Sequence, residues 1–223
     1  MAEIDRPARR VGRPRTTVLT RDLIAHAAIR LLDESGADGF TMLRLAQALR
    51  VRPSALYNHV DGKEDVIASV RELVSDRIDV SAFETEPWDT AMLAWAHSYR
   101  VAFAAHPPTI ALLATLPLTG ALRTMRMYDA VVAAMVRAGW PEAEVLPTIV
   151  AVESFILGSA LDAIAPADMF DPAGAEDAVP AFASAYRARS AALGATPPAD
   201  AAFETGLTAL LDGLRVRYES VRA

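Results

Sequence analysis

Hydrophobic residues recur every three or four positions along most of the chain, and no run alternates regularly between polar and apolar residues. Leu23, Ala27 and Leu31 form the first such stripe, and Thr20 precedes it as a suitable N-cap. The glycine-containing segment 35–39 ends this helix. Because a period of 3.6 residues places side chains on one face of a helix, the pattern predicts an all-α fold.

Two short helices are predicted after this first one. Thr41 can cap the first of them, and the second begins near Arg52, carries Pro53 in its first turn and ends near Val60. The apolar positions that would set the crossing of the pair are Leu45, Ala46, Leu49, Val51 and Leu56. Two short helices joined by a tight turn are typical of a helix-turn-helix.

Longer helices are predicted over the remainder of the chain. They cover 63–78, 88–106, 122–138, 141–165, 181–193 and 199–221, with a loop at 165–174. We therefore expect an arm (1–17), a three-helix helix-turn-helix domain (18–66) and a C-terminal helical domain (67–223), joined by the connecting helix 63–78.

Composition sets limits on the function. A chain of 223 residues with 52% hydrophobic residues can bury a substantial core, and its net charge of −6 gives no general indication of nucleic-acid binding. Arginine is nevertheless concentrated near the N-terminus, at Arg6, Arg9, Arg10, Arg13, Arg15 and Arg21. We expect residues 1–17 to form a flexible basic arm. The chain has no cysteine, which excludes disulfides, thiolate metal sites and cysteine nucleophiles.

The most apolar segment, 148–165, carries Glu153 and Asp162, so we interpret it as a packed helix with these acids at a rim or interface, and not as a membrane span. The N-terminal segment lacks the apolar core of a signal peptide. The four histidines show no metal-binding spacing, and neither a nucleophile elbow nor a phosphate-binding loop occurs. We therefore expect a cytoplasmic protein with no membrane partner, no cofactor, no metal site and no enzymatic activity.

The second short helix leaves a row of side chains free to contact another surface. These side chains are Ser54, Ala55, Tyr57, Asn58 and His59. Such a helix end fits the major groove of DNA, where Asn can bond adenine and Tyr, Ser or His can bond phosphate oxygens. The alternative is an ordinary polar helix end, with Tyr57 as a half-buried structural ring and His59 as a cap of its own helix.

Residues 40–67, FTMLRLAQALRVRPSALYNHVDGKEDVI, resemble the DNA-binding signature of the TetR family of bacterial repressors. The matching positions are Thr41, Leu45-Ala46, Val51, Leu56-Tyr57, His59-Val60 and Lys63-Glu64. The form Leu-Tyr-Asn-His-Val is closest to the tetracycline-repressor branch, and the last helices resemble that branch in architecture. The resemblance implies a sequence-specific regulator of transcription that binds double-stranded DNA.

The resemblance also implies roles for individual residues. Thr41 would cap its helix at a phosphate, and Arg44 would lie near the DNA backbone. Four residues would face the bases or the groove wall: Arg52, Pro53, Ser54 and Ala55. Three would contact phosphates, namely Tyr57, His59 and Lys63, and Asn58 would contact a base or a phosphate. Two positions depart from the family pattern, because Arg50 replaces the usual turn glycine and Leu43 replaces an arginine that reads a base.

The arm contains the sequence Gly-Arg-Pro at 12–14, which is similar to the core of minor-groove hooks. Arg13 and Arg15 would then enter a narrow A·T-rich groove, where the electrostatic potential is most negative. The alternative is a solubilising tail that makes no contact with DNA.

Aromatic and polarizable side chains are concentrated in the C-terminal region. We predict that seven of them line a ligand pocket among the central helices: Trp95, Tyr99, Phe103, His106, Met125, Tyr128 and Phe155. The alternative for each is an ordinary place in the core or, for His106, an exposed helix end. Tetracycline repressors bind magnesium with the drug, but no matching set of His and Glu residues occurs in this sequence.

Apolar helices around 148–165 and 199–219 are suited to a four-helix interface between two copies of the chain. A two-fold dimer would place its recognition helices about 34–36 Å apart and would require a palindromic operator. We therefore expect a homodimeric repressor that is released by a small apolar or aromatic effector. The alternative is a DNA-bound interaction protein without a small-molecule effector.

Overall fold

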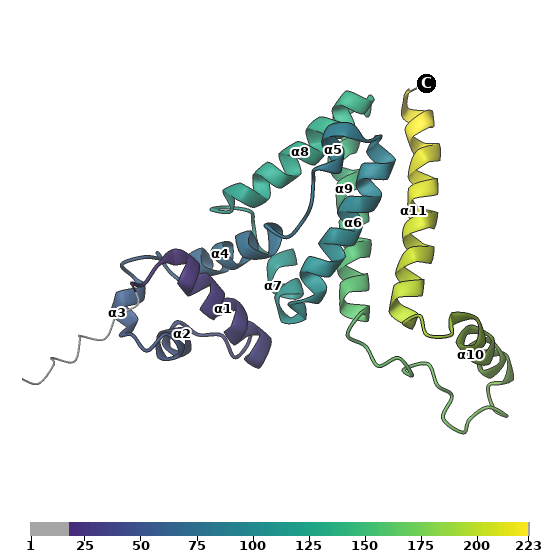
Figure 1. Ribbon diagram of the computed structural model, residues 1–223, viewed down its shortest axis with the longest axis horizontal. Helices are drawn as coiled ribbons and strands as arrows, with labels where there is room; N and C mark the ends of the chain where they lie inside the picture. Colours follow the sequence, from purple (N-terminus) through teal and green to yellow (C-terminus); the bar gives the residue numbers. More distant parts are fainter. Residues whose placement is uncertain (1–17, 223) are drawn as a thin grey trace, which may run out of the picture.

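The computed structural model describes residues 18–222, and over this range the chain is helical with no strand (Figure 1). The elements are α1 (Arg21–Ser35), α2 (Met42–Ala48), α3 (Pro53–Leu56), α4 (Lys63–Ser75), α5 (Ala82–Thr85), α6 (Trp88–Ala104), the 3₁₀ helix η1 (Pro107–Thr109), α7 (Ile110–Ala114), α8 (Leu122–Ala138), α9 (Glu142–Asp162), α10 (Pro180–Leu193) and α11 (Pro198–Arg222). The predicted all-α fold is confirmed.

Helices α1 to α4 pack around one apolar centre near the N-terminal end of the molecule. Ile24 and Leu32 of α1, Leu45 of α2, Leu56 of α3 and Val70 of α4 are completely buried there. A helix as short as α3 is not stable by itself. Burial of Leu56 in this shared centre therefore holds α3 in place.

The starts of α1 and α2 agree with the sequence. Thr20 Oγ1 accepts a hydrogen bond from the Leu23 N–H at 3.1 Å, and Thr41 Oγ1 accepts one from the Arg44 N–H at 3.2 Å. Each bond satisfies an amide that the first turn of a helix otherwise leaves unpaired. The predicted N-cap positions of Thr20 and Thr41 are confirmed.

The turn between α2 and α3 contains a residue in the left-handed region. Arg50 has a φ of 55°, and its N–H donates to the Gln47 carbonyl at 3.0 Å, while the Val51 N–H donates to the Ala46 carbonyl at 3.0 Å. For a residue with a Cβ this conformation costs roughly 1–2 kcal/mol. The two hydrogen bonds thus hold Arg50 in a geometry that glycine would adopt without strain.

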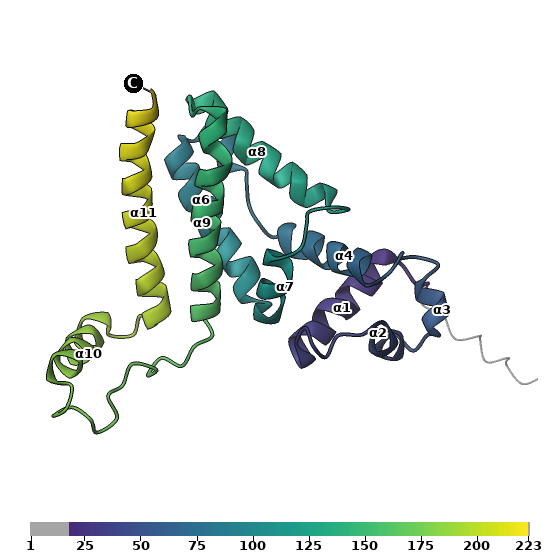
Figure 2. The same ribbon diagram turned by 180° about the vertical axis from the view of Figure 1, so that it is seen from behind.

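The C-terminal part is built around α6, α9 and α11, which lie side by side in both views (Figures 1 and 2). Met92 and Trp95 of α6, Val152 and Ile156 of α9 and Leu207 of α11 are completely buried. Helix α8 packs against α9 and also against α4, and α4 in turn packs against α1 and α6. Helix α4 therefore links the N-terminal helices to the C-terminal ones.

The structure departs from the predicted elements in two respects. Helix α3 ends at Leu56 rather than near Val60, because residues 57–59 form a turn in which the Val60 N–H still donates to the Leu56 carbonyl at 3.0 Å. In addition, α5, η1 and α7 occupy segments in which the pattern predicts no helix. These elements have three to five residues each, too few to show a helical period.

Helix α9 has the length and hydropathy that a membrane-spanning helix would need. A third of its apolar window, 33%, is buried, and it packs against α6, α8 and α11. We interpret α9 as a core helix of the C-terminal part.

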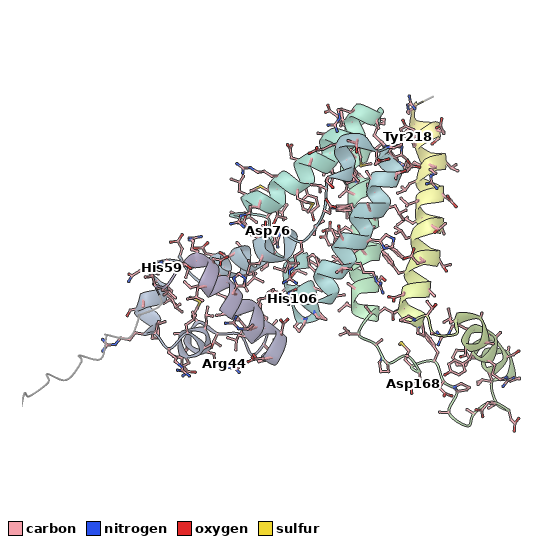
Figure 3. All side chains as sticks on the ribbon, viewed as in Figure 1. Arg44, His59, Asp76, His106, Asp168 and Tyr218 are labelled. Atoms are coloured by element: carbon pink, nitrogen blue, oxygen red, sulfur yellow. The ribbon has the colours of Figure 1, made fainter. Side chains whose placement is uncertain are left out.

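Helix α10 lies away from the other helices, and Ala183 is its one buried residue (Figure 2). The loop before it, which carries Asp168, extends outward with it (Figure 3). Phe170 of this loop packs against Phe182 of α10, with ring centroids 6.2 Å apart. The segment agrees with the loop predicted at 165–174 and the helix predicted at 181–193.

Candidate nucleic-acid interface and internal cavity

The side chains that begin α3 and follow it are exposed on the surface of the α1–α4 group. Arg52, Pro53, Ser54, Tyr57 and Asn58 are exposed, whereas Ala55 and His59 are partly buried. Tyr57 keeps 54% of its surface accessible, so its ring is available to a partner and is not a core ring. These residues form one polar surface around a short helix, as reading a groove requires.

Two of the cations predicted to bind phosphate lie beside the loop before α2. Arg44 donates from Nη1 to the Gly39 carbonyl at 2.7 Å, and Lys63 donates from Nζ to the Phe40 carbonyl at 3.4 Å. Both side chains retain further N–H donors, because guanidinium has five and ammonium has three. Figure 3 shows Arg44 and His59 on the same α1–α4 group.

An ion pair between α1 and α4 stabilises the turn that follows the exposed residues after α3. Arg21 binds the Asp65 carboxylate with two hydrogen bonds of 2.9 and 2.6 Å, and Asp65 also accepts the Asp61 N–H at 3.0 Å. This paired geometry fixes the turn that leads into α4. The predicted contacts of Arg13 and Arg15 lie outside the described residues.

A cavity of about 480 Å³ opens among α4, α6, α7, α8 and α9. Most of its wall is apolar, from Phe103, Leu113, Ala114, Leu116, Leu118, Met125, Leu146, Ile149, Val150 and Leu157. The polar part of the wall comes from Arg71, Ser75, Tyr99, Thr124, Tyr128, Glu153 and Ser154. A largely apolar cavity of this size with a few convergent polar groups is typical of a site for a small organic molecule.

Two tyrosines meet one carboxylate in this cavity. The Tyr99 O–H and the Tyr128 O–H both donate to Glu153 Oε1, the second at 2.5 Å. Burial raises the pKa of Tyr99, and the neighbouring Tyr128 and Glu153 raise it further. Burial likewise raises the pKa of Tyr128, and the negative charge of Glu153 adds to the effect. Both phenols therefore keep their protons and serve as donors to Glu153.

Arg71 reaches the cavity from α4. It is 5% exposed, and its Nη2 donates to the carbonyls of Leu113 and Leu116, each at 2.7 Å. Burial lowers the pKa of the Arg71 guanidinium, while Tyr128, Tyr99 and Glu153 raise it. The side chain ties α4 to the end of α7 and to the loop that follows α7.

Four of the seven predicted pocket residues, namely Tyr99, Phe103, Met125 and Tyr128, line the cavity. The other three lie elsewhere, which corrects the prediction. Trp95 is completely buried and donates from Nε1 to Met127 Sδ at 3.4 Å, Phe155 stacks on Phe203 with centroids 5.7 Å apart, and His106 Nδ1 lies 2.9 Å from the Asp33 carboxylate. Each of these side chains is engaged by a neighbour outside the cavity.

Sequence reasoning missed five polar residues of the cavity wall: Arg71, Ser75, Thr124, Glu153 and Ser154. Arg71 and Glu153 are the two charged ones. Glu153 was expected at a rim or an interface, but it forms part of the cavity wall. In the sequence, Glu153 stood out as one of two carboxylates, with Asp162, in the apolar segment 148–165. Arg71 had no comparable signal, because arginine is common on helix surfaces.

Two family models match the chain. "Bacterial regulatory proteins, tetR family" matches residues 24–70, and "Tetracyclin repressor-like, C-terminal domain" matches residues 82–218. The chain belongs to the TetR family. The resemblance of residues 40–67 to the DNA-binding signature of this family is thereby confirmed.

Several TetR-family relatives align with most of the length of this chain. An HTH-type transcriptional regulator of Saccharopolyspora erythraea is 31% identical over 202 residues, covering 88% of this chain and 85% of the relative. Tetracycline repressor protein class A from transposon 1721, of Escherichia coli, is 30% identical over 92% of this chain and 95% of its own. The crystal structure of a possible TetR family transcriptional regulator from Streptomyces coelicolor has a TM-score of 0.69 at 30% identity, covering 88% of this chain and 98% of that one.

Membership in the TetR family decides the general activity. The chain is a DNA-binding transcriptional regulator and not an enzyme. Within residues 18–222, no group of three or more His, Asp and Glu side chains is placed to hold a metal ion.

Proposed function

We propose that the protein is a homodimeric repressor that leaves a palindromic operator when a small apolar or aromatic molecule occupies the cavity. The observation that carries this proposal is that the cavity wall includes α4, through Arg71 and Ser75, while α4 also packs against α1. A ligand that displaces α4 would therefore move α1 and the helices packed on it. Such a ligand lowers operator affinity only if it binds the displaced state more tightly than the DNA-bound state.

The operator contacts that we propose are those of the exposed α3 surface and its flanks. The bases or the groove wall would be faced by Arg52, Pro53, Ser54 and Ala55. The DNA backbone would be contacted by Thr41, Arg44, Tyr57, His59 and Lys63, and Asn58 would contact a base or a phosphate. The exposure of Tyr57 and Asn58 and the spare donors of Arg44 and Lys63 support this division. Arg13 and Arg15 would add minor-groove contacts.

The proposed dimer forms through α9 and α11. Leu161 and Ile164 are exposed on or just beyond α9, and Val216 is 73% exposed on α11. Exposed apolar side chains gain free energy when a second copy removes them from water. The proposed division of the chain keeps residues 18–66 for DNA, 67–223 for ligand and dimer contacts, and 63–78 as the connection.

The tetracycline repressor among the relatives supports release of the operator by a small molecule. The proposed place of action is the cytoplasm, where the DNA lies. A second candidate function, docking of another protein without a small-molecule effector, is favoured by one feature. Met169, Phe170 and Phe182 are exposed on the outward segment that carries α10. A pocket that accepts no compound would favour this candidate.

Selection of random DNA by the purified full-length protein tests the proposed operator. We expect enrichment of a palindrome whose half-sites are about one helical turn apart. Enrichment of an asymmetric site would contradict the dimer, and enrichment of no sequence would contradict specific binding.

A further inference from the structure

Glu153 is a carboxylate in an apolar cavity with no cation at contact distance. Its Oε1 accepts both tyrosine O–H groups, and its Oε2 has no hydrogen bond to any residue between 18 and 222. Over the same residues, no Lys, Arg or His nitrogen lies within 4.0 Å of the carboxylate. The two phenol donors supply hydrogen bonds but no positive charge, so Glu153 has no cation in direct contact, and Arg71 acts on it only from a longer distance.

Arg71 faces the same cavity but forms no ion pair with Glu153. Its Nη2 is held by the carbonyls of Leu113 and Leu116 at 2.7 Å, on the wall formed by α4 and α7. Glu153 lies on α9 and is held by tyrosines of α6 and α8. The cavity therefore has an anionic part, bounded by α6, α8 and α9, and a separate donor part at Arg71.

The anionic part of the cavity is also its most aromatic part. Tyr99 and Phe103 stack with centroids 4.9 Å apart and an interplanar angle of 12°, and Tyr128 completes the wall. Aromatic rings next to a carboxylate are the surroundings that a desolvated ammonium group prefers, because the ring faces and the carboxylate both attract it. A neutral hydroxyl would satisfy the lone pairs of Oε2 but would leave the charge unpaired.

We propose that the effector of this protein is a polycyclic or aromatic molecule that carries a protonated amine, and that the amine pairs with Glu153 Oε2. The proposal deepens the proposed function, because it takes the cavity as the effector site. The apolar ring system would lie against Leu113, Met125 and Ile149, with its opposite end toward Arg71.

Two probes that differ in one group test the pairing. These are 9-(aminomethyl)anthracene, whose amine is protonated at neutral pH, and 9-anthracenemethanol, which has the same rings and a hydroxyl in that position. Their dissociation constants for the full-length protein would be measured by titration calorimetry. We expect the amine to bind about tenfold or more tightly than the alcohol, the ratio that a charged hydrogen bond supplies.

The variant Glu153→Gln removes the charge but keeps a carbonyl oxygen for the two tyrosines. It should weaken binding of the amine by about tenfold and leave binding of the alcohol within about twofold of the wild type. Glu142→Gln, at an exposed position of the same helix, serves as the matched control and should change neither constant. If Glu153→Gln does not fold, the ratio of the two probes in the wild-type protein still decides the question.

Equal affinity of the two probes for the wild type, an equal loss of both in Glu153→Gln, or binding of neither probe would overturn the inference. Operator affinity measured with and without the bound amine separates this inference from the proposed function. Tight amine binding without a change in operator affinity would contradict ligand release while the inference stands. A neutral polycyclic compound that releases the operator, and binds Glu153→Gln equally well, would contradict the inference while ligand release stands.

Discussion

The hydrogen bonds from Arg71 to the carbonyls of Leu113, in α7, and of Leu116, in the loop that follows α7, lead to a quantitative prediction about stability. The change Arg71→Met keeps a long side chain of similar reach but removes both hydrogen bonds to Leu113 and Leu116. A hydrogen bond from a charged donor contributes about 1.5–3 kcal/mol, and here one nitrogen serves both acceptors, so the loss is about 3 kcal/mol. Methionine offsets about 1 kcal/mol of this loss, because the folded protein no longer has to bury the guanidinium charge. We expect a net loss of about 2 kcal/mol in the free energy of unfolding.

For a chain of this size, a loss of about 2 kcal/mol corresponds to a decrease in Tm of about 4–8 °C. Urea unfolding followed by circular dichroism, together with a thermal scan, would measure both quantities. Arg126→Met is the matched control, because Arg126 is exposed on α8 and its replacement should change the free energy by less than about 0.5 kcal/mol. If Arg71→Met were as stable as this control, the two carbonyl bonds would not contribute to holding α4 against α7 and the loop that follows it.

Four further changes have distinct expected outcomes. Tyr57→Ala should weaken operator binding about fivefold in a gel-shift titration without dissociating the dimer, since one phosphate contact is lost; dissociation would instead show a structural ring. Removal of residues 1–15 should reduce the slope of log K against log salt by about one unit per lost phosphate contact, and an unchanged slope would show that the arm makes none. Thr41→Ala should lower the free energy of unfolding by about 1 kcal/mol, because the N-cap of α2 is lost, and an unchanged free energy would show that this cap does not stabilise the fold. Gly206→Ala should destabilise by about 1–3 kcal/mol, because its Cβ would lie 2.6 Å from ring carbons of Phe155, and an unchanged Tm would mean that this ring can move aside.

Local sequence patterns determined the helical class and the N-terminal elements. Caps such as Thr20 and Thr41 depend on interactions within a few residues, so the local sequence reveals them. Helical spacing also marks Leu45 and Leu56 as apolar positions that a packed fold would bury. The same reasoning located the polar surface after Pro53, because its residues are consecutive. The unusual turn at Arg50 was indicated by the resemblance to the TetR family, whose pattern has a glycine at this position, and the structure shows a left-handed φ of 55° there.

Only the tertiary structure decided which C-terminal side chains face the cavity. Helical spacing places Trp95, Tyr99 and Phe103 on one face, yet Trp95 is completely buried behind the wall while the other two line it. Glu153 meets Tyr99 and Tyr128 across sequence separations of 54 and 25 residues. Such contacts depend on how α6, α8 and α9 pack, and a pattern within one helix carries no information about the side chains of another. Glu153 was therefore conspicuous in the sequence as a carboxylate within an apolar segment, but its phenol partners and its open oxygen could be assigned only from the packed fold.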